Sequence, residues 1–155
     1  RTSDIVNWEI KIDPIKAVSE EAYNQYKDSQ DVRENDILFV NDGTFLIGRT
    51  AVVTKLDLKV VIQSHVRKIR VLDKKFIDPY YLFYLLNSKI VRKQMDSKTF
   101  VQATISTIGN RLREIVLPIS SDKNEVKKIT SEIENIINKK ADLREKTVKI
   151  VDNSI

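Results

Sequence analysis

The spacing of apolar residues near the C-terminus constrains the fold of this chain most strongly. Apolar side chains recur there at alternating intervals of three and four residues, a pattern that predicts one stripe along a long α-helix. Lys140 and Thr147 stand at the two polar positions of this seam, and polar seam residues can fix the register and number of partner helices. The apolar members of the seam are Val126, Ile129, Ile133, Ile136, Leu143 and Ile150.

A single apolar stripe has nothing within its own helix to bury against. We therefore expect residues 122–155 to form a spacer or dimerisation helix that packs against a partner helix. The alternative is a helix that lies on its own globular domain, which residues 1–121 would form.

Residues 36–72 have the short apolar runs of a sheet rather than a helical stripe. Residues 36–40 form a compact apolar run typical of a buried strand, and Asp42-Gly43 is a strong turn signal. Gly48 indicates a bulge or a close approach of the backbone to another segment. Further alternating or β-branched runs predict strands at residues 8–12, 45–47, 50–54, 59–62, 65–71 and 114–119.

Capping residues indicate where the other helices begin. Ser19 is followed by two glutamates, which favours a helix start, and Asp78-Pro79 predicts a helix that runs to Met95. Residues 105–112 predict a further short helix. The predicted fold class is α+β, with a twisted, mostly antiparallel sheet and flanking helices, followed by a long C-terminal helix of the coiled-coil type.

The chain carries a net charge of +5, and its positive charge is concentrated in the middle third. Residues 1–63 hold 8 Lys or Arg against 11 Asp or Glu, residues 64–113 hold 11 against 3, and residues 114–155 hold 8 of each sign. A clustered basic excess attracts polyanions through phosphate contacts and counterion release. The middle third therefore indicates nucleic-acid binding, with a solvated basic face as the alternative.

Several catalytic and metal-binding classes lack the residues that they need. The chain has no cysteine, which fits a cytosolic location, and its one histidine cannot form a multi-histidine metal site. Ser64 and His65 are neighbours on a predicted strand, so their side chains point to opposite faces, and we expect His65 to be a hydrogen-bonded sheet residue. Gly43 and Gly48 have the spacing of a phosphate-binding loop, but Arg49-Thr50 follows where Lys-Ser/Thr is required. No apolar run approaches the roughly 20 residues of a membrane-spanning helix.

A metal-dependent nuclease is the one catalytic class that the sequence leaves open. Asp42 and the Asp57-Leu58-Lys59 segment have a spacing that permits two carboxylates and a lysine to hold magnesium and polarise water. The pattern is short and common by chance, and Asp57 and Lys59 are also ordinary turn residues.

Basic and polar side chains are interleaved in the segments that we expect to bind DNA. Lysine and arginine neutralise phosphates, hydroxyl groups fix the register on the backbone, and Gln102 or Asn41 would approach bases or backbone. The predicted DNA-contact residues are Asn41, Thr44, Arg49, Arg67, Lys68, Lys98, Thr99, Gln102 and Thr104.

Five segments, in chain order, resemble the target recognition domains of type I restriction-modification specificity subunits. Each match is loose, but the ordered set is specific and covers most of residues 34–119. The segments are NDILFVNDGTFLIG (35–48), IQSHVRKIR (62–70), DPYYLFYLLNS (78–88), FVQATISTIG (100–109) and IVLPI (115–119). The helix predicted after them is similar to the spacer helices that join two recognition domains in that family.

The resemblance implies a bacterial or archaeal, cytoplasmic domain that reads double-stranded DNA and has no catalytic activity or cofactor of its own. Methyltransferase and restriction subunits, or fused domains, would supply adenine N6-methylation from S-adenosylmethionine and DNA cleavage. A coiled-coil assembly adaptor without DNA binding is the rival interpretation.

The chain departs from the family pattern in two respects. A standard specificity subunit has two recognition domains and two spacer helices, whereas this chain has one of each, and Ser120 stands where a further proline is common. The chain would thus be half of a specificity subunit, a half-length subunit that dimerises, or the C-terminal piece of a fused enzyme. The residues around Asp42-Gly43 and residues 102–105 are most similar to the fused type.

Overall fold

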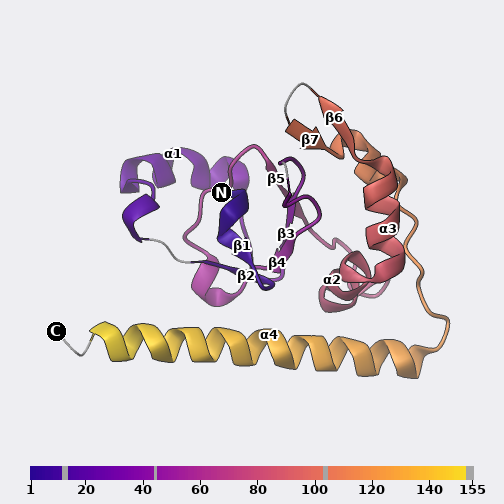
Figure 1. The fold of residues 1–155 in the computed structure, drawn as a ribbon. Helices are drawn as coiled ribbons and strands as arrows, with labels where there is room; N and C mark the ends of the chain where they lie inside the picture. Colours follow the sequence, from indigo (N-terminus) through magenta and orange to yellow (C-terminus); the bar gives the residue numbers. More distant parts are fainter. Residues whose placement is uncertain (12–13, 44, 103–104, 153–155) are drawn as a thin grey trace.

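A three-stranded antiparallel sheet forms the centre of the fold in the computed structural model (Figure 1). Strand β3 (Ile37–Val40) lies between β4 (Thr50–Val52) and β5 (Val66–Ile69). All four residues of β3 are buried, as its continuous apolar run predicts for a central strand that is covered on both faces. The structure describes residues 1–11, 14–43, 45–102 and 105–152.

The strand register defines the two ends of this sheet. At one end Ile37 lies opposite Val52 and Ile69, and at the other end Val40 lies opposite Val66. Segments that follow β3 therefore lie at the opposite end of the sheet from segments that follow β4 or β5.

One face of the sheet is covered by helices. Ile37 and Phe39 pack in a cluster with Phe83 of α2 (Pro79–Asn87), and α3 (Lys89–Lys98) adds further buried side chains. Because successive side chains of a strand point to opposite faces, this cluster uses every second residue of β3. The helix-covered face contains most of the largest fully buried side chains of the described residues.

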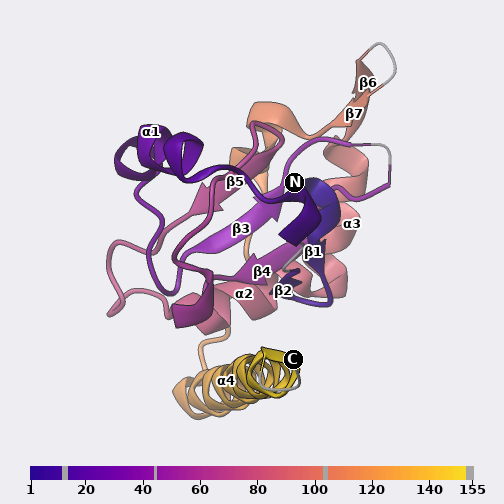
Figure 2. The same ribbon diagram turned by 90° about the vertical axis from the view of Figure 1, so that its left-hand side faces the viewer.

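The other face of the sheet is covered more thinly. Leu38 and Val40 pack with Ile5, which belongs to a two-residue strand, β1 (Ile5–Val6), paired with β2 (Glu9–Ile10). Figure 2 shows this small hairpin beside β4 and the helix α1 further out. The short 3-10 helices of the fold are η1 (Thr2–Asp4), η2 (Pro14–Lys16), η3 (Lys55–Asp57) and η4 (Gly109–Glu114).

The predicted helix starts at Ser19 and Asp78 are both confirmed. The Ser19 hydroxyl accepts a hydrogen bond from the amide of Ala22 at 3.2 Å, and α1 (Glu20–Gln30) follows. Asp78 caps α2 by accepting from the amide of Tyr80 at 2.8 Å. These caps satisfy amide groups that the first turn of a helix leaves without a partner.

The single helix predicted from Pro79 to Met95 was wrong, because Ser88 divides it into α2 and α3. Ser88 has an extended backbone (φ −67°, ψ 149°), and its hydroxyl caps α3 by accepting from the amide of Val91 at 3.4 Å. A serine side chain can compete for backbone amides in this way and start a new helix. The break turns α3 away from the direction of α2, so that α3 leads toward β6 and β7 (Figure 1).

The prediction of a short helix at residues 105–112 was also wrong. Residues Phe100–Gln102 form β6 and pair with β7 (Ile105–Thr107), and the 3-10 helix η4 begins only after this hairpin. Residues 114–119, 45–47 and 59–62, predicted as strands, do not lie in any strand. At Ile62 the side chain of Gln30 explains the difference, since it bonds both the amide and the carbonyl of Ile62 (2.7 and 2.8 Å) in place of a neighbouring strand.

Helix α4 (Lys123–Asp152) is the long C-terminal helix that the seam predicted, and its presence confirms the α+β fold class. Asp122 caps it by accepting from the amides of Asn124 and Glu125 at 2.8 and 3.2 Å. The helix runs along one side of the domain beneath α2 and the sheet, as Figures 1 and 2 show. No helix of the described residues is long and apolar enough to cross a membrane.

One face of α4 packs on its own domain. Ile137 is buried in the same cluster as α2, and Ile133 packs against that cluster. Further along, Lys140 pairs with Glu9 at 2.7 Å, and Arg144 pairs with Asp57 at 2.6 Å. The alternative that the helix lies on its own domain is therefore confirmed for this face.

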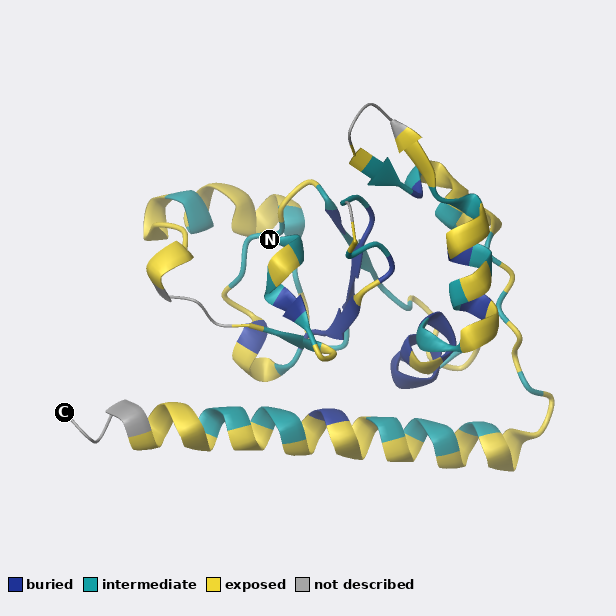
Figure 3. Cartoon of the chain, in the orientation of Figure 1, coloured by how far each residue is buried: buried dark blue, intermediate teal, exposed yellow. Residues whose placement is uncertain are grey.

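The predicted seam leaves that face along the helix (Figure 3). Val126, Ile129 and Ile133 are partly covered, whereas Ile136, Leu143 and Ile150 are exposed. An α-helix has about 3.6 residues per turn, so a seam with a 3.5-residue repeat drifts by about 20° per heptad around it. A partner helix for the exposed half of the seam stays a prediction.

Candidate nucleic-acid interface

The β6–β7 hairpin projects from the domain on the side opposite α4, as both views of the ribbon show (Figures 1 and 2). Phe100 lies opposite Thr107 in this hairpin, and Val101 lies opposite Ser106. Val101 is 70% exposed although it is apolar. A short two-stranded hairpin with exposed apolar residues is only marginally stable alone, so its attachment to the domain determines how it is presented.

Asp42 attaches the hairpin to the central sheet. Its carboxylate accepts hydrogen bonds from the Asn41 side-chain amide (2.7 Å) and from the Thr107 hydroxyl, and it lies 3.4 Å from His65 Nδ1. We call these four residues the Asp42 cluster. Asn41 and Asp42 follow β3, His65 precedes β5, and Thr107 belongs to β7. Three segments that are distant in sequence therefore meet at one end of the sheet.

Backbone hydrogen bonds reinforce the Asp42 cluster. Asp42 and Thr107 form an isolated antiparallel bridge, and the amide of Gly43 donates to the carbonyl of Ser106 at 2.9 Å. The amide of Ile108 donates to the carbonyl of Asn41 at 3.2 Å. The hairpin and the segment that follows β3 are therefore one continuous structure.

The loop between β3 and β4 is held at several points. Gly48 has φ +78°, a β-carbon there would lie 3.0 Å from the sulfur of Met95, and the Gly48 carbonyl accepts a hydrogen bond from Arg92. The predicted close backbone approach at Gly48 is confirmed. Leu46 and Ile47 pack against the two core clusters, one on each face of the sheet.

One cationic side chain lies against the hairpin, and others are exposed on neighbouring segments. The Arg111 guanidinium lies 4.8 Å from the centre of the Phe100 ring, and Arg113 is exposed on the same 3-10 helix. Arg49 is exposed where the β3–β4 loop ends. Residues 89–114, from α3 through η4, hold six Lys or Arg, one Asp and one Glu. A hairpin that is attached to the domain and has a local cationic excess is suited to a polyanion such as duplex DNA.

The comparison with known families agrees with this geometry. A family model described as type I restriction modification DNA specificity domain matches residues 6–151. The chain belongs to this family. It therefore provides sequence-specific DNA recognition in a type I restriction-modification system, and the family is not catalytic in itself. No protein of curated function matches the sequence.

Three of the predicted DNA-contact residues, in addition to the surface ion pair of Lys98, have internal partners in this specificity domain. Asn41 is only 4% exposed and belongs to the Asp42 cluster. The Lys68 ammonium donates to the carbonyls of Gln30 and Asp31 at the end of α1, and the Thr99 hydroxyl donates to the carbonyl of Met95 at 2.8 Å. These side chains stabilise the fold around the interface rather than extend from it.

The other predicted contact residues are placed as follows. Arg49 is exposed, and Arg67 is partly buried, with no hydrogen bond or ion pair from its side chain to another described residue. Lys98 pairs with Glu114 at 2.9 Å, and its hydrogen bond lowers the pKa of the Glu114 carboxyl. Gln102 lies in β6, but its side chain is outside the description, and Thr44 and Thr104 lie outside the described residues.

Arg70, the residue after β5, is held by carboxylates of its own domain. Its guanidinium bonds the buried Asp36 carboxylate at 2.7 Å and the Asp31 carboxylate at 2.8 Å. Hydrogen bonds from Arg33 and Arg70 lower the pKa of Asp31 to about 2. Lys68 of β5 and Arg70 after it are therefore both bonded to residues at the C-terminal end of α1.

Phe45 and Arg111 are interface candidates that the sequence-based set omitted. Phe45 is 90% exposed beside the Asp-Gly turn, and Arg111 follows the β6–β7 segment. The sequence places Phe45 beside the predicted Asp-Gly turn and Arg111 in the basic middle third. These positions became informative only once β6 and β7 were known to pair beside the Asp42 segment.

The two carboxylates of the nuclease hypothesis lie at opposite ends of the sheet. Asp42 follows β3, whereas Asp57 follows β4 and is buried against Arg144. The Thr54 amide and hydroxyl donate to Asp57 at 3.0 and 2.6 Å. The described residues contain no group of three or more side chains that could hold a metal ion. The geometry therefore does not bring these carboxylates into one metal site.

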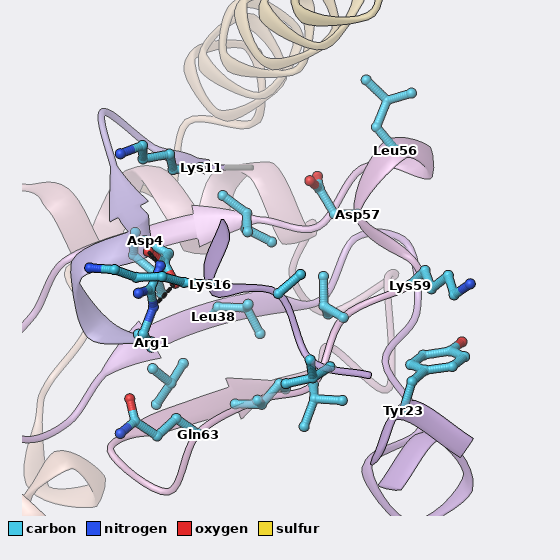
Figure 4. Close-up of a pocket in the computed structure, with 18 of the residues that line it drawn as sticks. Arg1, Asp4, Lys11, Lys16, Tyr23, Leu38, Leu56, Asp57, Lys59 and Gln63 are labelled. Carbon is cyan, nitrogen blue, oxygen red and sulfur yellow. Dashed lines mark hydrogen bonds and ion pairs between the residues drawn. The ribbon is translucent and has the colours of Figure 1, made fainter. Parts of the chain in front are cut away.

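A hollow of about 740 Å³ opens on the thinly covered face of the sheet (Figure 4). Its floor is aliphatic, with Leu38, Val66 and Ile5 among the lining residues, and Lys16 and Lys59 lie at its margin. None of the predicted DNA-contact residues that the structure describes is among its lining residues. The hollow and the nucleic-acid interface are therefore different parts of the surface.

Proposed function

We propose that this specificity domain binds duplex DNA through the face formed by the β6–β7 hairpin, the β3–β4 loop and η4. The observation that carries the proposal is the Asp42 cluster, because it joins the hairpin and the loop at one end of the sheet, on the side away from α4. Segments held in this way can enter a DNA groove with little loss of conformational entropy.

The cations on this face would bind phosphates. Arg49, Arg111 and Arg113 are exposed, and none of them has an ion pair with another described residue. Each phosphate contact releases condensed counterions, which makes binding salt-dependent without selecting a sequence. Polar and apolar groups of the hairpin and the loop would then read base edges, since these contacts alone distinguish sequences directly.

Helix α4 would connect this DNA-reading unit to the rest of the enzyme. Its inner face already packs on the domain, and its outer face presents Ile136, Leu143 and Ile150 at heptad spacing. We propose that this outer stripe packs on the helix of a second recognition unit, in the same chain or in a homodimer. The helix would then set the distance between two half-sites.

The family implies association with methyltransferase and restriction subunits or domains. We propose that those partners bind S-adenosylmethionine, methylate adenine and cleave DNA in the cytoplasm of a bacterium or archaeon. This chain would recognise the target DNA sequence and hold no cofactor. Half of a specificity subunit, a dimerising half-length subunit and a piece of a fused enzyme all fit this division of roles.

The experiment that tests the proposal is selection from a pool of randomised duplex DNA without added metal, at two salt concentrations. The expected result is a short enriched motif that is bound more tightly at low salt. Dimerisation through α4 without any affinity for DNA at low salt would contradict the proposal and favour an assembly adaptor.

A further inference from the structure

Phe45 is an aromatic residue whose side chain lies at the protein surface. It is 90% exposed. Single exposed apolar residues are common on protein surfaces and need no function by themselves. Phe45 differs from that ordinary case because Gly43, Leu46 and Ile47, close to it in the chain, are bonded or packed within the domain.

The residues next to Phe45 determine its position. On one side, the Gly43 amide is bonded to the carbonyl of Ser106 in β7. On the other side, Leu46 and Ile47 pack against the two core clusters. The chain turns sharply there, since the amide of Arg49 donates to the carbonyl of Leu46 at 3.0 Å. With Leu46 and Ile47 packed inward, Phe45 is left on the outside of the loop.

The surroundings of Phe45 identify its partner. The loop that carries it is bonded to the β6–β7 hairpin, where Val101 and Ile105 are also exposed. The same end of the domain carries the cations Arg49 and Arg111. Apolar side chains and cations at one end of a domain match a DNA duplex, in which stacked bases are the apolar part and phosphates flank them.

We propose that Phe45 contacts the bases of the recognised DNA and is a specificity-determining residue. Its ring would lie against base edges or between base steps, while the neighbouring arginines bind phosphates. This inference rests on the proposed DNA-binding function and assigns the base contact within it. It gives the β3–β4 loop a role in reading sequence as well as in supporting the hairpin.

The test compares Phe45→Ala with Phe76→Ala as a matched control. Phe76 is 76% exposed and follows β5, at the end of the sheet opposite Asp42. Because both rings are exposed, neither substitution removes core packing, and thermal melting of both variants should match the wild type. Affinities would be measured for the motif selected with the wild type and for a scrambled duplex, at two salt concentrations.

For Phe45→Ala we expect affinity for the selected motif to fall about tenfold, the size of effect seen when a base-stacking aromatic is removed. Affinity for the scrambled duplex and the salt dependence should not change, because phosphate contacts are retained. Phe76→Ala should behave as the wild type. A second probe, 2-aminopurine placed in the motif, should give a fluorescence change on wild-type binding that Phe45→Ala lacks.

An unchanged ratio of motif to scrambled affinity in Phe45→Ala would overturn this inference while leaving the proposed function in place. An equal loss for both duplexes would also overturn it, because it would assign Phe45 to general affinity. Failure of the wild type to bind any duplex would overturn the proposed function and the inference with it.

Discussion

The ion pair between Arg144 and Asp57 predicts how firmly α4 is held on the domain. The two side chains are 17% and 2% exposed, and Arg144 also donates to the carbonyl of Ile10 at 2.8 Å. Arg144→Met keeps the apolar stem of the side chain and removes its charge. The Asp57 carboxylate would then be buried without its cation.

Removing one partner of a buried ion pair costs about 3–5 kcal/mol. Asp57 would keep its two hydrogen bonds from Thr54, so we expect the lower end, about 3 kcal/mol. For a chain of this length, about 1 kcal/mol corresponds to about 2–4 °C in Tm, which gives a decrease of about 6–12 °C. Urea unfolding followed by circular dichroism and thermal melting would measure both quantities.

Lys149→Met is the matched control on the same helix. Lys149 pairs with Glu145 at 2.7 Å, but both side chains are largely exposed, and such pairs add little stability. This variant should melt as the wild type does. If Arg144→Met were no less stable than Lys149→Met, the ion pair would not hold α4 to the domain, and the packing of this face would not be a stable feature.

Three further predictions follow from the charged and apolar surfaces. Lys98→Ala should weaken binding to all duplexes alike and reduce the slope of log affinity against log salt by about 1. Salt titration would measure this slope, and an unchanged slope would show that Lys98 does not contact phosphate. Asp31 has a folded-state pKa of about 2, below its usual 3.8, so its stabilising contribution is present above about pH 4 and is lost as the pH falls toward 2. Arg70→Met should flatten this part of the acid-unfolding profile, and a profile as steep as that of the wild type would refute the assignment. If the outer stripe of α4 binds a second helix, Leu143→Glu on that stripe should abolish self-association in analytical ultracentrifugation and leave Tm unchanged. A dimer that persists in this variant would place the interface elsewhere.

Local patterns predicted the framework of the fold. The apolar run at residues 36–40 indicated the buried central strand, and Ser19 and Asp78 indicated two helix starts, because strand burial and helix capping depend on adjacent residues. The long C-terminal helix followed from its seam in the same way.

Features that depend on distant contacts could not be predicted. Gln30 replaces a strand partner for Ile62, although the two residues are far apart in sequence. Ser88 could have continued a helix or capped a new one, and packing of α3 decides between these outcomes. The hairpin at residues 100–107 was missed because its strands are short and their partner surface is the Asp42 segment.

The cations of the basic middle third have two different environments in the structure. The basic excess of residues 64–113 includes Arg111 and Arg113 of η4, which follows the hairpin, but it also includes Lys68 and Arg70, which bond α1. Net charge counts all cations equally, whereas the fold decides which of them have internal partners. The exposure of Phe45 depended on the same tertiary information.

The most direct test of the DNA-binding face compares two double charge reversals with the same change in net charge. Arg49→Glu with Arg111→Glu alters the hairpin side of the domain, and Lys128→Glu with Lys139→Glu alters exposed positions of α4 on the other side. Affinity for the selected duplex at low salt is the measurement. We predict that the first variant loses binding and that the second binds nearly as the wild type does, because screening limits the effect of charges beyond about 10 Å. Equal losses in the two variants, or a greater loss in the α4 variant, would contradict the assignment of the DNA-binding face.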